Sequence, residues 1–177
     1  ASHYGDYFQG MLLIGALSGI RAYRYKNFCL DLYRLFKGER YHLDNFALKK
    51  RLKLSRNFNS QHPFSYLTDN EDVVNRLSND TLTNFSYTVK GYSDIFKIIR
   101  HANSEETYHK TPGYLSTWIA AGTMDPVTRL GKDSKVIYNN YKNFGMSDIT
   151  LKLYEGRRHA LLFGKNRMDV YTDILKW

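Results

Sequence analysis

The sequence lacks the features that define several large classes of protein. It contains a single cysteine, Cys29, which excludes an intrachain disulfide framework and a cysteine-rich zinc site. No stretch approaches the roughly 18 consecutive apolar residues of a membrane-spanning helix. The best candidate, MLLIGALSGI at residues 11–20, is shorter and is interrupted by glycine. The first residues do not have the pattern of a signal peptide, and we recognise no internal repeat and no low-complexity tract.

What remains is the composition of a globular domain with a basic surface. The 177 residues are 42% apolar, which is enough to bury a core in one domain. The net charge is +9, and residues 20–58 alone hold eleven Lys and Arg against three Asp and Glu, a balance of +8. Such a basic field attracts nucleic acid, anionic lipid or phosphorylated substrates, but it is equally the solvated face of a helix. Both interpretations stay open on the sequence alone.

Nucleic acid is the least favoured of these partners. Aromatic residues make up 15% of the chain. They recur at helix and strand periods, however, which core packing explains, and no RNA-binding motif such as Lys-Gly-Phe-Gly-Phe is present. We therefore expect no nucleic-acid partner.

The hydropathy pattern predicts an α/β fold with a parallel sheet. Continuous or alternating apolar runs predict strands at residues 11–17, 114–122 and 148–154. Helical periodicity predicts a helix after the second strand and a final helix that presents Met168, Tyr171, Ile174 and Leu175 inward. The order strand, helix, strand, helix over residues 114–177 is typical of a parallel sheet.

Between the first two strands the sequence predicts helices. Apolar residues recur at helical spacing over residues 27–36, 43–54 and 91–103. In the first of these helices one side is expected to carry Phe28, Leu32, Leu35 and Phe36. Residues 20 to about 110 are therefore expected to form a helical insertion between strands of the sheet.

Two polar residues follow successive strands of the predicted sheet. Asp125 comes just after strand 114–122, and His159 comes just after strand 148–154. Ligands of parallel α/β sheets bind at the carboxyl ends of the strands, so we expect the two side chains to lie side by side. Such a pair is the orienting half of a nucleophile–His–Asp triad. The alternatives are structural, because Asp125 before Pro126 is a common helix start and His159 could cap or pack the final helix.

Four segments match the pattern of one enzyme group. AAGTMDPVTRLGK has a Gly-x-x-Asp-Pro-Val type motif, and LKLYEGRRHALLFGKNRMDVYTDILKW has a Tyr-x-Gly-x-Arg-His type motif and an Asp-Ile-x-x-Trp close. FSYLTDNEDVVNRLSNDTLTNFSYTVKGYSDIF is similar to the group's cap region, and GMLLIGALSG to the strand that follows the nucleophile's helix. The chain thus resembles the C-terminal part of α/β hydrolases of the monoacylglycerol lipase and lysophospholipase group. The resemblance implies a core strand in residues 1–19, a helical cap insertion in 20–112, and a C-terminal core with the Asp and His of the triad in 113–177.

The resemblance also implies an activity. It implies a serine hydrolase that cleaves lipid esters, of monoacylglycerol or lysophospholipid type, through an acyl-serine intermediate. Asp125 would orient His159, which would act as general base and then general acid, and no metal or organic cofactor is expected. The alternative on the same fold is a peptidase or a non-lipid esterase. Alternatives of another class are a non-catalytic protein of hydrolase fold and a basic nucleic-acid-binding protein.

Two features depart from the group's pattern. Ala160 stands where the group often has Glu after the His. The Gly-x-Ser-x-Gly nucleophile elbow is absent, and GALSG places Ser18 in Gly-x-x-Ser-Gly at the end of a later strand. We therefore expect a missing N-terminal segment to carry the nucleophile and the oxyanion donors, and residue 1 to fall inside the helix that follows the nucleophile.

The expected partners are a small-molecule lipid ester, that missing segment and, as a candidate, an anionic membrane surface. Residues 20–58 combine their cations with Phe and Leu, and a basic face beside an apolar one is what interfacial binding needs. The residues expected nearest the lipid are Lys49, Lys50, Arg51 and Lys53. The expected location is cytoplasmic, with peripheral membrane association.

Overall fold

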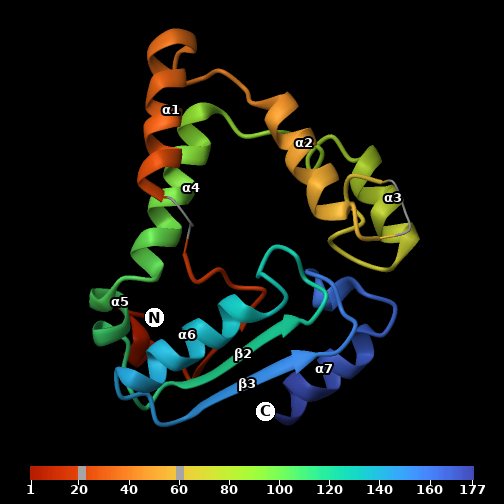
Figure 1. The fold of residues 1–177 in the computed structure, drawn as a ribbon. Coiled ribbons are helices and arrows are strands. Elements are labelled where there is room, and N and C mark those ends of the chain that lie inside the picture. Colours follow the sequence, from red (N-terminus) through yellow and green to blue (C-terminus); the bar gives the residue numbers. More distant parts are fainter. Residues whose placement is uncertain (20–22, 59–61) are drawn as a thin grey trace.

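The centre of the protein is a three-stranded parallel sheet in the order β1-β2-β3 (Figure 1). This computed structural model describes residues 1–19, 23–58 and 62–177. The strands are β1 (Gly10–Ile14), β2 (Ser116–Gly122) and β3 (Ile149–Tyr154). Leu12 pairs with Trp118, which in turn pairs with Thr150. The parallel sheet with its helical connections confirms the predicted fold class.

The first strand is shorter than the sequence predicted. It ends at Ile14 instead of Leu17, because Gly15 has a φ of 64° and turns the chain out of the sheet. A left-handed φ of this size favours glycine, which has no Cβ to collide with the backbone. The apolar run in the sequence thus extends to Leu17, whereas the strand itself ends at Ile14.

Each face of the sheet is covered by one helix of the C-terminal part. Successive side chains of a strand point to opposite faces, so neighbouring residues of β2 belong to different core clusters. Ile119 packs with Ile137 of α6, and Trp118 packs with Val170 of α7. The bounds of these helices are Lys132–Asn143 for α6 and Arg167–Lys176 for α7.

The buried side of α7 differs from the predicted one. Val170 is buried and Ile174 packs beside it, whereas Met168 and Leu175 are exposed. The inward pair is spaced by four residues, which places both members on one helix face. The predicted stripe included side chains from the solvent side of that helix.

In the described residues between β1 and β2, five helices follow one another. They are α1 (Tyr23–Lys37), α2 (Asp44–Ser55), α3 (Glu71–Asn79), α4 (Val89–Ala102) and α5 (Glu105–Lys110). We call residues 23–110 the helical insertion. Figure 1 shows α1 and α4 side by side, while α2 and α3 reach across to the loops beyond the arrowheads of β2 and β3. A small core of the insertion consists of Leu30, Leu43, Val89 and Tyr92, with Phe96 packed against it.

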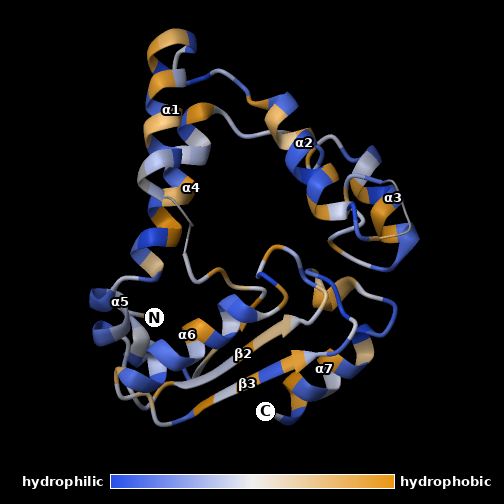
Figure 2. Ribbon diagram, viewed as in Figure 1, coloured by the Kyte–Doolittle hydropathy of each residue, from blue (hydrophilic) through white to orange (hydrophobic). Residues whose placement is uncertain are grey.

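The apolar side of α1 is not buried as a core stripe. Leu35 is 82% exposed and Phe36 is 79% exposed, and Phe28 is exposed as well. The residue of α1 that reaches the core of the insertion is Leu30. Figure 2 shows hydrophobic colour on α1 at its end furthest from the sheet. This helix therefore presents apolar side chains that no described part of the chain covers.

No helix in the described ranges has the length and apolar character needed to cross a membrane.

Candidate active site

Asp125 and His159 meet at the carboxyl ends of β2 and β3. His159 Nδ1 lies 2.8 Å from Asp125 Oδ2, within the reach of a hydrogen bond. The Asp125 side chain is fully buried, and the His159 side chain is 28% exposed. The two strand ends thus bring a buried carboxylate against an imidazole that reaches the surface.

The buried carboxylate of Asp125 is surrounded by donors. Its Oδ1 accepts a hydrogen bond from the Val127 N–H at 2.8 Å, and its Oδ2 accepts one from the Thr128 hydroxyl at 2.9 Å. An ionised carboxylate can only accept, so the facing nitrogen of His159 must carry the proton. Nε2 then has a free lone pair, and no described residue is hydrogen-bonded to it. The pair is therefore arranged so that Nε2 can take up a proton from a third group.

The turn after Asp125 is shaped around the carboxylate. The Leu130 N–H donates to the Asp125 carbonyl at 2.7 Å. Arg129 and Leu130 have φ values of 55° and 61°, a left-handed conformation that costs roughly 1–2 kcal/mol for each non-glycine residue. Asp125 is not the N-cap of the next helix, since α6 begins at Lys132.

Two glycines allow the loop that carries His159 to approach the strands. A Cβ on Gly122, the last residue of β2, would lie 2.0 Å from the Arg157 carbonyl oxygen. A Cβ on Gly15, just after β1, would lie 3.0 Å from His159 Cε1. A side chain at either position would displace the histidine loop. Gly15 and Thr128 were not predicted to contribute to the site; for Gly15 the available signal was a glycine that closes an apolar strand.

The helical insertion is hydrogen-bonded directly to the histidine loop. The Arg158 guanidinium donates to the carbonyl oxygens of Ser65 at 2.7 Å and Thr68 at 2.8 Å. The Ala160 N–H donates to the Leu67 carbonyl at 2.7 Å. We call these contacts the latch. They tie the loop next to His159 to a segment that lies 90 to 93 residues earlier in the chain.

Tyr66 lies in the middle of the latch segment, and its carbonyl accepts a hydrogen bond from the His159 N–H at 3.4 Å. Burial raises the pKa of its phenol; the positive charge of Arg51 opposes this rise and the negative charge of Asp125 adds to it. The phenol therefore stays neutral in the electrostatic field of the Asp125–His159 pair.

Ser18, the serine nearest to a nucleophile motif, is bound to other residues. Its hydroxyl donates to Asp133 Oδ1 at 2.5 Å and accepts a hydrogen bond from Arg129 Nη2 at 3.2 Å. Within residues 1–19, 23–58 and 62–177 no group of three or more His, Cys, Asp or Glu side chains is placed to hold a metal ion. The described part of the chain therefore brings together Asp125 and His159 and holds no serine hydrogen-bonded to His159.

A comparison with known families matches most of the chain. The family model described as serine aminopeptidase, S33, matches residues 1–166. The chain belongs to the S33 family. A search of the curated proteins gave no match to this S33 chain.

Several solved structures share the fold of this S33 chain. A carboxyl esterase from Bacillus coagulans in complex with glycerol has a TM-score of 0.81 at 17% identity, and the match covers 99% of this chain and 56% of that one. A monoacylglycerol lipase from Paleococcus ferrophilus has a TM-score of 0.70 at 15% identity, covering 99% and 60%. A soluble variant of monoglyceride lipase from Saccharomyces cerevisiae has a TM-score of 0.70 at 16% identity, covering 99% and 59%. At these identities the likeness establishes the α/β hydrolase fold, and the chain spans 56–60% of the length of these structures.

The hydrogen bonds around Asp125 predict where one proton lies. In ¹⁵N-labelled protein at alkaline pH, the neutral His159 should carry its proton on Nδ1, because the carboxylate can only accept. Asp125→Asn should move the proton to Nε2, since the new amide can donate to Nδ1. Asp148→Asn, which alters an exposed carboxylate elsewhere, should leave the spectrum of His159 unchanged. A proton found on Nε2 in the unaltered protein would contradict the arrangement.

Proposed function

We propose that the protein is a serine hydrolase of ester bonds in which Asp125 orients His159 and His159 transfers protons. One observation carries the proposal. A buried carboxylate lies 2.8 Å from Nδ1 of a partly exposed histidine, whose Nε2 has no partner among the described residues. Geometry of this kind supports general base catalysis at Nε2.

In the proposed reaction a serine hydroxyl gives its proton to Nε2 of His159 while its oxygen attacks the ester carbonyl carbon. Asp125 remains ionised and stabilises the imidazolium that forms. The imidazolium then gives the proton to the leaving alcohol, and the acyl-serine remains. Water attacks the acyl carbon while its proton passes to Nε2 of His159, and the imidazolium then returns that proton to the serine oxygen as the acyl C–O bond breaks and the acid leaves. The reaction as written involves no cofactor.

We propose that the serine and the oxyanion donors belong to a segment outside these 177 residues. The sequence has no Gly-x-Ser-x-Gly motif. β1 lies at an edge of the sheet, and Leu12 on its α7 side is 42% exposed. Strands of parallel sheets are normally buried on both faces, and an apolar strand at an edge exposes unpaired backbone groups. The free edge of β1 is therefore suited to pairing with a further strand. This edge adjoins Gly15 and therefore His159.

The proposed substrate is a lipid ester of monoacylglycerol or lysophospholipid type. The fold neighbours support an ester, because one is a carboxyl esterase in complex with glycerol and two are monoacylglycerol lipases. The matched family is described as a serine aminopeptidase, and this favours a second candidate reaction, the hydrolysis of the amino-terminal bond of a peptide. Both reactions use the same Asp–His pair, so the leaving group is what separates them.

The helical insertion is the proposed cap of this site, with residues 1–19 and 113–177 as the core. The latch places Ser65 and Thr68 next to the histidine loop, so the insertion begins to cover the strand ends where Asp125 and His159 lie. A cover of this kind excludes water from the reaction and receives the apolar part of a substrate.

The proposed activity predicts a clear pattern of rates. The 177-residue chain alone should not hydrolyse p-nitrophenyl butyrate, whereas the complete protein with its nucleophile segment should. In that protein His159→Ala should lower the rate about 10⁴-fold or more, because triad members act as a unit. His101→Ala, on the exposed side of α4, should leave the rate unchanged.

The same assay separates the candidate substrates. An ester hydrolase should cleave the butyrate ester in strong preference to an amino-acid p-nitroanilide, and an aminopeptidase should show the reverse. Ester hydrolysis by the 177-residue chain that survives His159→Ala would show that other residues carry the reaction.

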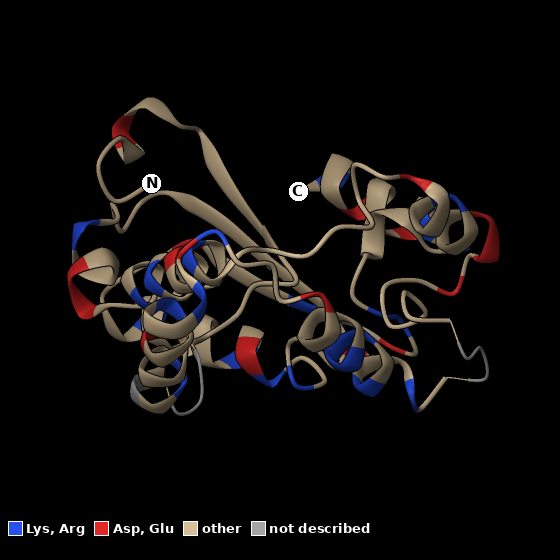
Figure 3. Ribbon diagram, turned by 90° about the horizontal axis from the view of Figure 1, so that it is seen from above, with Lys and Arg blue, Asp and Glu red and all other residues tan. Residues whose placement is uncertain are grey.

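The insertion is also proposed to contact an anionic lipid surface. Its α1 exposes Phe28, Leu35 and Phe36, and Lys and Arg are spread over the helices of the insertion when the molecule is viewed from above (Figure 3). Partial desolvation of the Lys50 ammonium lowers its pKa, and the positive charge of Lys26 on α1 lowers it further, although the Lys50 side chain remains exposed. An anionic surface beside exposed apolar side chains would relieve this repulsion.

One residue expected at this surface has another role. The Arg51 guanidinium donates to Asn84 Oδ1 at 3.0 Å and to the Phe85 carbonyl at 2.5 Å, and it lies over the Phe64 ring. Arg51 therefore holds the insertion together. Lys49 and Lys53 on the exposed side of α2 remain the cations proposed to face the lipid.

Vesicle sedimentation tests this contact. The complete protein should bind anionic vesicles better than neutral ones, and raising the salt from ~50 mM to ~500 mM should release it, because salt screens exposed charges. Lys49→Glu with Lys53→Glu should weaken binding, since each cation near an anionic surface contributes roughly 1 kcal/mol. Lys132→Glu with Lys142→Glu, the same charge change on α6, is the control and should have a smaller effect. Equal binding to neutral and anionic vesicles would show that the cations of the helical insertion are exposed to solvent and do not contact the lipid.

A further inference from the structure

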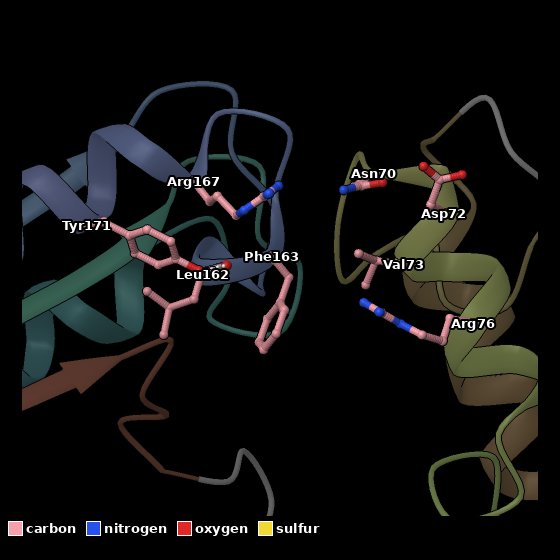
Figure 4. A pocket seen from close by; sticks show the side chains of 8 residues that line it. All are labelled: Asn70, Asp72, Val73, Arg76, Leu162, Phe163, Arg167 and Tyr171. Atoms are coloured by element: carbon pink, nitrogen blue, oxygen red, sulfur yellow. Dashed lines mark hydrogen bonds between the residues drawn. The ribbon is translucent and has the colours of Figure 1, made fainter.

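A second pocket lies between the helical insertion and the core, and neither Asp125 nor His159 lines it. It has a volume of about 450 Å³. One wall comes from the start of α3, and the other comes from the short helix η2 (Leu161–Phe163) and from α7 (Figure 4). Its lining residues are Asn70, Asp72, Val73, Arg76, Leu162, Phe163, Arg167 and Tyr171. The volume lies within the range of about 300–1,000 Å³ that is usual for small-molecule sites.

Two arginines point into this pocket from opposite walls. Arg76 extends from α3 and Arg167 extends from the first residue of α7, each toward the gap (Figure 4). Neither guanidinium has a hydrogen bond or an ion pair with any described residue. Asp72, the acidic side chain among the lining residues, stays on the α3 side (Figure 4). The pocket thus has an excess of positive charge, carried by two planar groups whose donors match carboxylate or phosphate oxygens.

The rest of the lining is apolar except for the amide of Asn70. Val73 on one wall faces Phe163 on the other, and Leu162 lines the pocket beyond Phe163 while it packs against the core beside α7. The Tyr171 hydroxyl donates to the Leu162 carbonyl at 2.7 Å, so its polar group is satisfied and its ring adds apolar surface. A ligand that fills this space needs a hydrocarbon part as well as an anionic group.

The two walls are held together without a ligand. The Thr68 hydroxyl donates to the Phe163 carbonyl at 3.1 Å, and Asp69 Oδ1 accepts a hydrogen bond from the Lys165 N–H at 3.0 Å. The second of these bonds engages one oxygen of the Asp69 carboxylate. The pocket is therefore formed in advance, so binding costs little ordering of the chain.

We propose that this pocket binds an anionic amphiphile, meaning a carboxylate or phosphate group carried on a hydrocarbon tail. The anionic group lies between Arg76 and Arg167, and the tail lies on Leu162, Phe163 and Val73. The site is independent of the proposed hydrolase reaction, because it uses none of the groups assigned to that reaction.

Calorimetric titration of the full-length protein tests the site with four probes: octanoate, octyl phosphate, octanol and inorganic phosphate. Octanoate or octyl phosphate should bind at least tenfold more tightly than octanol and than inorganic phosphate, since only an amphiphile uses both walls. Whichever of the two binds more tightly identifies the anionic group as carboxylate or phosphate. Arg76→Gln and Arg167→Gln should each weaken that binding about tenfold, the usual effect of losing one hydrogen bond to a charged group.

The matched control is Arg56→Gln, which removes an exposed arginine outside the pocket and should leave the affinity unchanged. Circular dichroism should show the same unfolding temperature for all three variants, because neither pocket guanidinium has a partner within the described fold. The proposal is overturned if octanol binds as tightly as the anionic probes, or if Arg56→Gln weakens binding as much as the pocket variants do.

Discussion

A fully buried carboxylate at the end of β2 constrains the structure around it. Moving an unpaired charge out of water costs several kcal/mol, so Asp125 must receive hydrogen bonds from groups that the fold delivers. It receives them from Val127, Thr128 and His159. The first two come from the tight turn that follows Asp125 itself. The third comes from the loop that follows β3, and that contact requires close packing of two loops.

Close packing in turn explains why residues far apart in the chain converge here. Gly122 and Gly15 leave room for the histidine loop. Arg158 and Ala160 on that loop then bind the backbone of the insertion. Thr68 and Asp69, next to these contacts, form further hydrogen bonds to the core beside the second pocket. One set of hydrogen bonds between insertion and core thus fixes both the Asp125–His159 pair and the walls that carry Arg76 and Arg167.

Much of this architecture could be predicted from local patterns. Buried parallel strands are continuous apolar runs, and ligands lie at their carboxyl ends, so the placement of Asp125 and His159 side by side followed from strand order. Boundaries and exposed faces could not be predicted in this way. Periodicity identifies an apolar face on α1 but not what covers it, and it cannot tell that Val170 rather than Met168 faces the sheet. The contacts of Thr128 and Arg51 depend on turn geometry and on residues distant in sequence, for which the sequence holds no periodic signal.

The central claim is that His159, held by Asp125, activates a serine that this chain does not contain. Covalent labelling with a fluorophosphonate, followed by mass spectrometry, tests it most directly, because the probe reacts with a serine only when a base removes its proton. In the complete protein the label should appear on one serine outside residues 1–177, and His159→Ala should abolish it. A label on Ser18 or on any other serine of the chain, or labelling that persists in His159→Ala, would contradict the account.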